Sequence, residues 1–390
     1  MSAVADLAVL DLLAELDDIG RDERGGWTRP GFGPEALALE RWFAARASGI
    51  GLDVSRDRNG NLWAWWGAAG SDAVVTGSHL DSVPGGGRLD GPLGVVSALV
   101  AVQRLRASGF HPAKPVAVAV FAEEEGSRFG VACLGSRLLT GAVEPAVVLP
   151  AGFVGLDAMG RDDDALARIG CFVELHVEQG RGLVDLDAPV GLAAVILAHG
   201  RWRMTVTGRG DHAGTTRMVD RADPVVAAAR VVLAVEQAAL AVDGARATVG
   251  RVEAVPGGTN VIASRVELSL DVRAEEGATV RALVSRIEEA GALEAARNGC
   301  GFGIEQGSWS DRVVFDVALR ERLDAALGGV PALPTGAGQD AGILAAHVPT
   351  AMLFVRNPTG VSHAPEEDAS EADLDAGAAA LELALRTLAA

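Results

Sequence analysis

Histidines and carboxylates gather in four short stretches of this chain, and each stretch ends or follows a run of apolar residues. In chain order these groups are His79, Asp81 and Asp90 in GSHLDSVPGGGRLDG, the glutamates 123–125 after VAVAVFA, His176 in ELHVEQG, and His363 in GVSHAPEE. Imidazole and carboxylate groups together suit borderline divalent ions such as Zn, Mn, Co or Ni. Two such ions need a bridging carboxylate and terminal ligands for each, so the pattern predicts a metal centre.

Each group also has a purely structural interpretation. Asp90 precedes Gly91-Pro92 and a helical pattern, so it is a natural N-cap with proline in the first turn. The glutamate triplet could be a solvated loop, and a single histidine is more often structural than a ligand. The metal interpretation is favoured by joint occurrence, because three of only seven histidines lie at strand ends beside acids.

The first half of the chain alternates strand-like and helix-like segments. We expect a hairpin over 52–67 with an Asn59-Gly60 turn, buried strands over 73–78, 115–122 and 171–178, and a helix over 91–109. Near-continuous apolar strands separated by helices predict a sheet that is covered on both faces. In such sheets ligands bind at the carboxyl ends of the strands, where the four groups could converge.

From about residue 200 the pattern changes to the order βαββαβ of a ferredoxin-like unit. The expected strands are 201–208, 247–255, 264–273 and 301–308, and the expected helices are 223–242 and 278–296. After this unit the α/β pattern resumes with a helix over 316–328, a glycine-rich loop, a strand over 350–355 and a final helix. We therefore predict an α/β domain of residues 1–198 and 309–390 with an inserted domain of residues 199–308.

Composition bounds the class of protein. A chain of 390 residues that is 49% hydrophobic can bury two cores. No uninterrupted run of apolar residues, however, approaches the length that a membrane span needs. The net charge of −18 argues against nucleic acid as a partner. The acidic N-terminus is typical of an amphipathic helix and not of a signal peptide, and three scattered cysteines favour a reducing cytoplasm.

Six motifs in this order resemble one known family. They are GSHLDSVPGGGRLDGPLG, FAEEEGSRFG, FVELHVEQG, DHAGTTRM, GGTNVI with DVR, and GVSHAPEE, and they span roughly residues 55 to 370. The chain resembles the hydantoinase/carbamoylase branch of the M20 metallopeptidase-like amidohydrolases. The resemblance implies a mixed-sheet, zinc-peptidase-like catalytic domain, two divalent metal ions per subunit, and a ferredoxin-like lid domain through which a homodimer forms.

The resemblance also implies roles for the metal-site residues. Gly126 sets the register of the glutamate triplet, so that Glu123 is the additional residue. The implied ligands are His79 and His176 for one ion, Glu125 and His363 for the other, and Asp90 as the bridge. Asp81 would orient His79 from behind, and Glu124 would be the general base.

Four residues of the lid match substrate contacts of the family. His212 would donate to the oxyanion from the partner subunit, while Asn260 and Arg273 would hold a substrate carboxylate. His199 stands where relatives often carry a polar substrate contact. A surface charge is the structural alternative for Arg273.

The sequence departs from the family pattern at two positions, of which the first, Gln339, removes a possible proton donor or ligand near the metals. Gln339 in GAGQDAG replaces a histidine that many relatives carry, and Arg217 stands where proline is common, for which we have no physical account. The leading expectation is hydrolysis of allantoate with release of ammonia and carbon dioxide. An N-carbamoyl-L-amino acid or a β-ureido acid is the second choice, and an aminoacylase, a dipeptidase or a non-catalytic binding protein is more distant.

Overall fold

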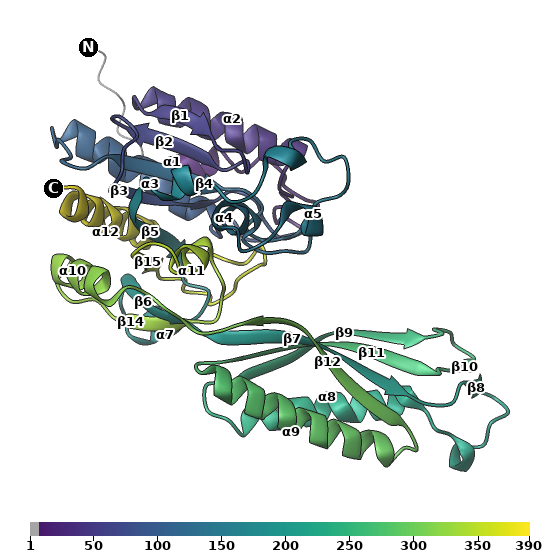
Figure 1. The fold of residues 1–390 in the computed structure, drawn as a ribbon. Coiled ribbons are helices and arrows are strands. Elements are labelled where there is room, and N and C mark those ends of the chain that lie inside the picture. Colours follow the sequence, from purple (N-terminus) through teal and green to yellow (C-terminus); the bar gives the residue numbers. More distant parts are fainter. Residues whose placement is uncertain (1–7) are drawn as a thin grey trace. The chain divides into compact units, whose positions relative to one another are not determined.

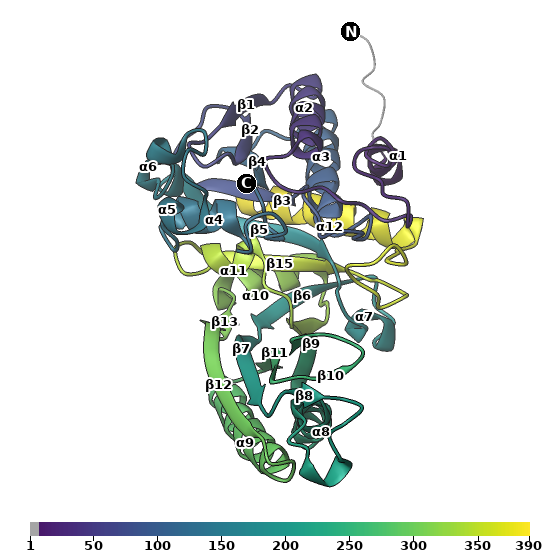
Figure 2. The ribbon, with the colours of Figure 1, turned by 90° about the vertical axis from the view of Figure 1, so that its right-hand side faces the viewer.

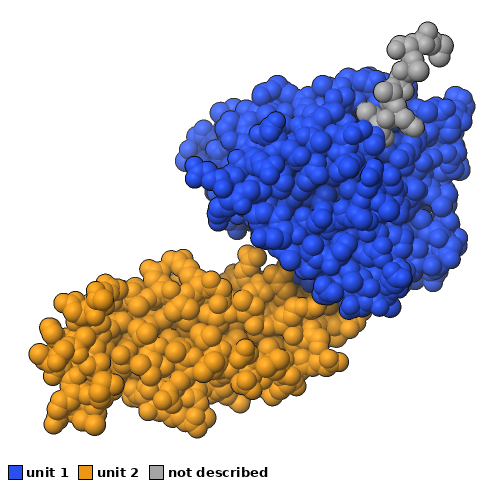
Figure 3. All heavy atoms as spheres, turned by 180° about the vertical axis from the view of Figure 1, so that it is seen from behind, with its two compact units in different colours: residues 1–195, 314–390 blue, residues 196–313 orange. Residues whose placement is uncertain are grey.

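The computed structural model describes residues 8–390, which form two compact units (Figure 3). Unit 1 comprises the chain up to Val195 and from Val314 onward, and unit 2 comprises Ile196–Val313. Within residues 8–390, no helix has the length and apolar character that a bilayer span requires. The expected N-terminal helix is present in part as α1 (Val9–Ala14), and residues 1–7 lie outside the described range.

Unit 1 is built on a nine-stranded mixed sheet (Figure 1). Its order is β1-β2-β4-β3-β5-β15-β6-β13, with β14 also pairing with β6. The strands are β1 (Asp53–Arg56), β2 (Leu62–Trp66), β3 (Ala73–His79), β4 (Val116–Phe121), β5 (Ile169–Val177), β6 (Val190–Ile196), β13 (Val313–Val314), β14 (Ala332–Thr335) and β15 (Thr350–Val355). The predicted mixed α/β fold is confirmed, whereas β6, β13 and β14 were not predicted.

The central strands are covered by helices on both faces (Figure 2). The helices are α2 (Pro34–Gly49), α3 (Pro92–Ala107), α4 (Leu134–Thr140), α5 (Pro145–Val148), α6 (Asp163–Leu166), α7 (Gly182–Asp185), α10 (Val317–Leu327), α11 (Asp340–Leu344) and α12 (Glu371–Ala389). Val173, Leu175 and Val177 of β5 join the core beneath α3 and α12. The alternate residue Glu174 points to the other face, where it accepts a hydrogen bond from Ala341 of α11.

Unit 2 is an antiparallel four-stranded sheet with two helices. The sheet order is β12-β7-β11-β9, the expected ferredoxin-like arrangement. The elements are β7 (Ala198–Thr207), β8 (Asp211–His212), α8 (Pro224–Leu240), β9 (Arg246–Val255), β10 (Val261–Ile262), β11 (Arg265–Ala274), α9 (Gly277–Ala296) and β12 (Gly301–Ser310). Both helices pack on the sheet around a core of its own, since alternate residues of β7 and β11 are buried.

Candidate metal centre

The sheet of unit 1 brings the four groups of histidines and carboxylates to one edge. Strands β4, β3, β5 and β15 are adjacent and mutually parallel, so their carboxyl ends coincide. His79 is the last residue of β3 and His176 is the next-to-last residue of β5. The glutamates follow β4, and His363 lies in the loop after β15. The convergence expected from strand ends is therefore present.

The first donor group consists of His79, Asp90 and His176, all buried. The Oδ1 atom of Asp90 lies 3.6 Å from Nε2 of His79 and 3.2 Å from Nε2 of His176. Two ligands that bind one tetrahedral ion at 2.0–2.1 Å are about 3.3 Å apart, so this spacing fits one cation. Neither Nε2 atom has a hydrogen-bond partner among the described residues. Two buried nitrogens without partners fit metal ligands better than structural histidines.

The second donor group consists of Asp90, Glu125 and His363. The Nε2 atom of His363 lies 3.3 Å from Oδ2 of Asp90 and 3.5 Å from Oε2 of Glu125. His363 has a φ of 58°, a left-handed conformation that is uncommon for residues other than glycine. Because Asp90 contributes Oδ1 to the first group and Oδ2 to the second, its carboxylate joins the two.

The two groups strongly perturb each other's ionisation. Burial by itself would raise the pKa of Asp90, but the imidazoles of His176, His363 and His79 hold that pKa well below its usual range. The hydrogen bond to Asp90 raises the pKa of His363 to about 9. Burial, followed by the charge of Asp90, raises the pKa of Glu125 to about 7. The site is thus a cluster of mostly buried groups, with His363 exposed, whose excess negative charge protons or cations must balance.

Glu124 lies beside the first group. It is 4% exposed, and its Oε2 atom is 3.7 Å from Nε2 of His79. Its other oxygen, Oε1, accepts a hydrogen bond from the Sγ–H of Cys133 at 3.2 Å. Burial raises the pKa of Glu124 well above its ordinary value, and the nearby acid Asp340 adds to this effect. A carboxylate with a raised pKa beside a metal site is suited to accept and return a proton.

The hydrogen bond between Asp81 and His79 is made by the backbone carbonyl of Asp81 and not by its carboxylate. Nδ1 of His79 lies 3.1 Å from the carbonyl oxygen of Asp81 but 3.7 Å from Oδ1. The carboxylate instead accepts hydrogen bonds from the backbone N–H groups of Glu124 and Glu125, both at 3.0 Å. Asp81 therefore fixes the tautomer of His79 and the position of the glutamates at the same time.

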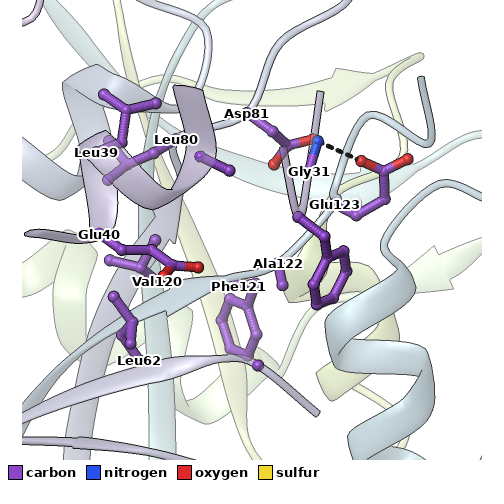
Figure 4. A pocket seen from close by; sticks show the side chains of 13 residues that line it. Gly31, Leu39, Glu40, Leu62, Leu80, Asp81, Val120, Phe121, Ala122 and Glu123 are labelled. Atoms are coloured by element: carbon purple, nitrogen blue, oxygen red, sulfur yellow. Dashed lines mark hydrogen bonds between the residues drawn. The ribbon is translucent and has the colours of Figure 1, made fainter. Parts of the chain in front are cut away.

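Glu123, the additional residue of the triplet, has a structural role. Its carboxylate accepts hydrogen bonds from the backbone N–H groups of Gly31, Arg128 and Phe129. Figure 4 shows Asp81 and Glu123 beside a small cavity of about 30 Å³, with the bond from Gly31 drawn. Glu123 thus anchors the loop that carries Glu124 and Glu125.

The expectation that Asp90 caps helix α3 is wrong. The N-cap residue is Gly91, with a φ of 85°, and glycine has no side chain with which to cap the helix. The side chain of Asp90 is directed to the histidines instead, so it cannot satisfy the first-turn N–H groups. The pattern Asp-Gly-Pro placed the helix start correctly but assigned the cap to the wrong residue.

Gln179 belongs to the site although the sequence did not single it out. Its Nε2 donates to Oδ2 of Asp90 at 2.8 Å and to Oγ of Ser362 at 3.0 Å. Its Oε1 accepts a hydrogen bond at 3.0 Å from Nε2 of Gln339, the residue that replaces a histidine of the family. The available signal was its position in ELHVEQG, three residues after His176.

The substrate residues predicted in unit 2 form two separate pairs. His199 and Arg273 are opposite each other across β7 and β11. The guanidinium of Arg273 donates to both carboxylate oxygens of Asp271, and burial lowers the pKa of His199. His212 and Asn260 lie instead around the β8–β10 pair, beyond the other end of the sheet, where Val261 pairs with His212 (Figure 1).

His212 has a defined tautomer in this setting. The backbone N–H of Gly214 donates to its Nδ1 at 3.0 Å, so the neutral ring carries its proton on Nε2. The side chain is exposed, and the backbone carbonyl of Asn260 accepts from the N–H of Ala213 beside it. His212 therefore presents an N–H donor at the surface of unit 2.

Comparison with known proteins places the chain in a family. The sequence model that describes Peptidase family M20/M25/M40 matches residues 75–387 of this chain. The chain is 34% identical to the N-carbamoyl-L-amino acid amidohydrolase of Geobacillus stearothermophilus over 388 residues, covering 95% of each chain. It is 32% identical to the allantoate amidohydrolase of Escherichia coli, covering 98% of each. A crystal structure of an amidase of the hydantoinase/carbamoylase family from Burkholderia vietnamiensis matches with a TM-score of 0.85 and 31% identity, covering 98% of this chain and 96% of that one. The chain therefore belongs to Peptidase family M20/M25/M40, as a metal-dependent hydrolase of its hydantoinase/carbamoylase branch.

Proposed function

We propose that the protein hydrolyses a linear C–N bond of a ureido or N-carbamoyl acid, with allantoate as the first-choice substrate, at a centre of two divalent ions. The observation that carries this proposal is the carboxylate of Asp90, whose two oxygens belong to two different donor groups. Relatives named for N-carbamoyl-L-amino acids and for allantoate support the substrate class.

The residues fit the ions that this chemistry needs. His79 and His176 would hold one ion, Glu125 and His363 the other, and Asp90 both, with Zn, Mn, Co or Ni as candidates. The unpartnered Nε2 atoms of the two buried histidines and Oε1 of Glu125 are free for this purpose among the described side chains. When bound, two ions supply Lewis acidity and make the attacking water more acidic.

The chain itself supplies proton transfer and orientation. Glu124 would accept a proton from the attacking water and deliver it to the leaving nitrogen, while Asp81 holds the backbone of Glu124 in place. His212, with its proton on Nε2, would donate a hydrogen bond to the oxygen that develops negative charge. Asn260 and Arg273 would bind the substrate carboxylate, with His199 beside Arg273.

The geometry of unit 2 supports a homodimer. From His199 to Thr207, strand β7 advances eight residues, which is roughly 26 Å. His212 follows Thr207 and lies in the β8–β10 pair beyond that end of the sheet (Figure 1), so His212 and Arg273 of one subunit cannot both contact one small substrate. If both residues serve the reaction, one of them must come from a partner subunit, and we assign that role to His212 together with Asn260, which lies beside it at the β8–β10 pair.

Ammonia release from allantoate, an N-carbamoyl-L-amino acid and a β-ureido acid tests the substrate, with the metal-stripped protein reloaded with Zn, Mn, Co or Ni. Allantoate is expected to give the highest kcat/KM, because EEEGSRF and FVRNPTGVSH look closer to the allantoate branch. A higher value for an N-carbamoyl amino acid would select the second candidate. Faster hydrolysis of a dipeptide or an N-acyl amino acid would overturn the ureido class, and binding without turnover would overturn catalysis.

A further inference from the structure

We propose that Glu367 is the residue that positions Asp90, and that it thereby sets the affinity of both ion sites. This inference rests on the proposed two-ion centre. The Oε1 atom of Glu367 accepts hydrogen bonds from the backbone N–H groups of Leu89 and Asp90, both at 2.9 Å. Glu367 is 4% exposed, so these bonds are shielded from water.

The segment around Asp90 needs such support. Three glycines (85–87) precede it, and Gly91, which follows it, is the N-cap of helix α3 and has no side chain to fix the start of the helix. A glycine-rich segment has many accessible backbone conformations. The bonds from Glu367 hold the N–H groups of two consecutive residues and so restrict the direction in which the Asp90 side chain leaves the backbone.

The packing around Glu367 is specific to its carboxylate. A Cβ atom added at Gly87 would lie 2.3 Å from Oε1 of Glu367, so only glycine leaves room for the carboxylate at this position. The second oxygen, Oε2, is buried and has no hydrogen-bond partner among the described residues. A buried carboxylate oxygen without a hydrogen-bond partner is destabilising, so packing alone does not explain why a glutamate is buried at this position.

Glu367 also connects Asp90 to a ligand of the second group. His363 lies four residues earlier in the same loop, and the backbone N–H of Glu367 donates to the carbonyl of Ala364 at 3.1 Å. One loop thus carries His363 and holds the backbone of Asp90. Because both donor groups contain Asp90, loss of the Glu367 contact should weaken both ion sites and not only the nearer one.

Calorimetric titration of the metal-stripped, full-length protein with Co²⁺ tests whether Glu367 sets the affinity of both ion sites. The visible Co²⁺ absorption is a second readout. The wild type is expected to bind two ions. Glu367→Ala should weaken both binding steps by about 10- to 100-fold, the usual effect of removing a residue that holds a metal ligand. Glu367→Gln keeps an oxygen acceptor for both N–H groups and should restore near wild-type affinity. Gly87→Ala, which displaces the carboxylate, should resemble Glu367→Ala.

Two further variants separate positioning from general stability. His363→Ala should weaken one step and leave the other nearly unchanged. Asp57 also accepts hydrogen bonds from two backbone N–H groups, those of Asn59 and Asn61, but in the β1–β2 turn. Asp57→Ala should therefore lower the melting temperature without changing Co²⁺ affinity.

The possible failures are distinguishable. A folded Glu367→Ala variant that binds two Co²⁺ ions as tightly as the wild type would overturn the role of Glu367 and leave the two-ion centre intact. A Glu367→Gln variant as weak as Glu367→Ala would also overturn it, because the acceptor would then not be the relevant feature. A wild type that binds no Co²⁺ would instead refute the proposed metal centre itself.

Discussion

The carboxylate of Asp81 accepts a hydrogen bond from the backbone N–H of Glu124 at 3.0 Å, and its second oxygen accepts one from Glu125 at the same distance. The backbone carbonyl of Asp81 faces Nδ1 of His79. One buried aspartate therefore positions the proposed base and two proposed ligands, so a change at this residue should affect proton transfer and metal binding together.

Asp81→Asn should lower kcat/KM and the retained metal content, because asparagine keeps one acceptor but directs an amide N–H toward a backbone N–H. We expect a loss of about 10- to 100-fold in kcat/KM. Steady-state kinetics and metal analysis of the same preparation measure both quantities. Asp57→Asn is the matched control, since it alters another aspartate that holds two backbone N–H groups, and it should leave both quantities near wild type.

Local patterns predicted the central strands β3, β4, β5 and β15 and the four long strands of unit 2, but not β6, β13 and β14. They also predicted a metal centre, whereas the role of each ligand candidate came from the family resemblance. Apolar runs predict buried strands, and histidines or acids at their ends predict convergence on one edge of the sheet. The roles of Asp81 and Glu367 depend on contacts between segments 43 and 277 residues apart in the chain. No local pattern encodes such contacts, and for the same reason the cap was assigned to Asp90 and Gln179 was missed.

Subunit complementation tests whether His212 acts across a dimer. Glu124→Gln should lower kcat by about 10²- to 10⁴-fold with metal retained, because the base is lost while the ligands remain. His212→Ala should lower kcat by about 10²- to 10³-fold, the usual effect of removing an oxyanion donor. Co-expression of the two variants should recover about a quarter of wild-type activity, because half of randomly formed dimers carry one intact site.

If His212 acts within its own subunit, co-expression of the two variants should recover no activity. Mixed dimers would then contain no intact site, and activity would stay at the sum of the two variants. Co-expression of Glu124→Gln with Asp81→Asn is the control, since both residues lie in unit 1 and each dimer would carry a defect in every site. This pair should show no recovery.

Arg273→Ala should mainly raise KM for substrates that carry a carboxylate, because the guanidinium would bind this group equally in the ground state and the transition state. Bidentate recognition also makes lysine a poor replacement, so Arg273→Lys should recover little. Initial-rate kinetics with allantoate as the substrate measure KM and kcat. Arg265 lies on the same strand at its opposite end, and Arg265→Ala should leave KM unchanged. An unchanged KM for Arg273→Ala would place the carboxylate site elsewhere.

Asp340 should make the stability of the metal-free protein fall as pH rises. Burial, followed by the charge of Glu174, raises the pKa of Asp340 from 3.8 to about 8, and its Oδ1 accepts a hydrogen bond from the hydroxyl of Ser136. Between these two pKa values the folded state holds a proton that the unfolded state has released. The free energy of unfolding therefore decreases with pH across this window, by up to about 1.4 kcal/mol per pH unit.

Asp340→Asn keeps the acceptor and is neutral at every pH. The free energy of unfolding of this variant in urea, measured between pH 5 and pH 8 with a chelator present, should therefore fall less steeply than that of the wild type. Replacing the exposed Asp243 by asparagine should leave the slope unchanged. Equal slopes for the wild type and Asp340→Asn would show that Asp340 is already ionised in the folded, metal-free protein.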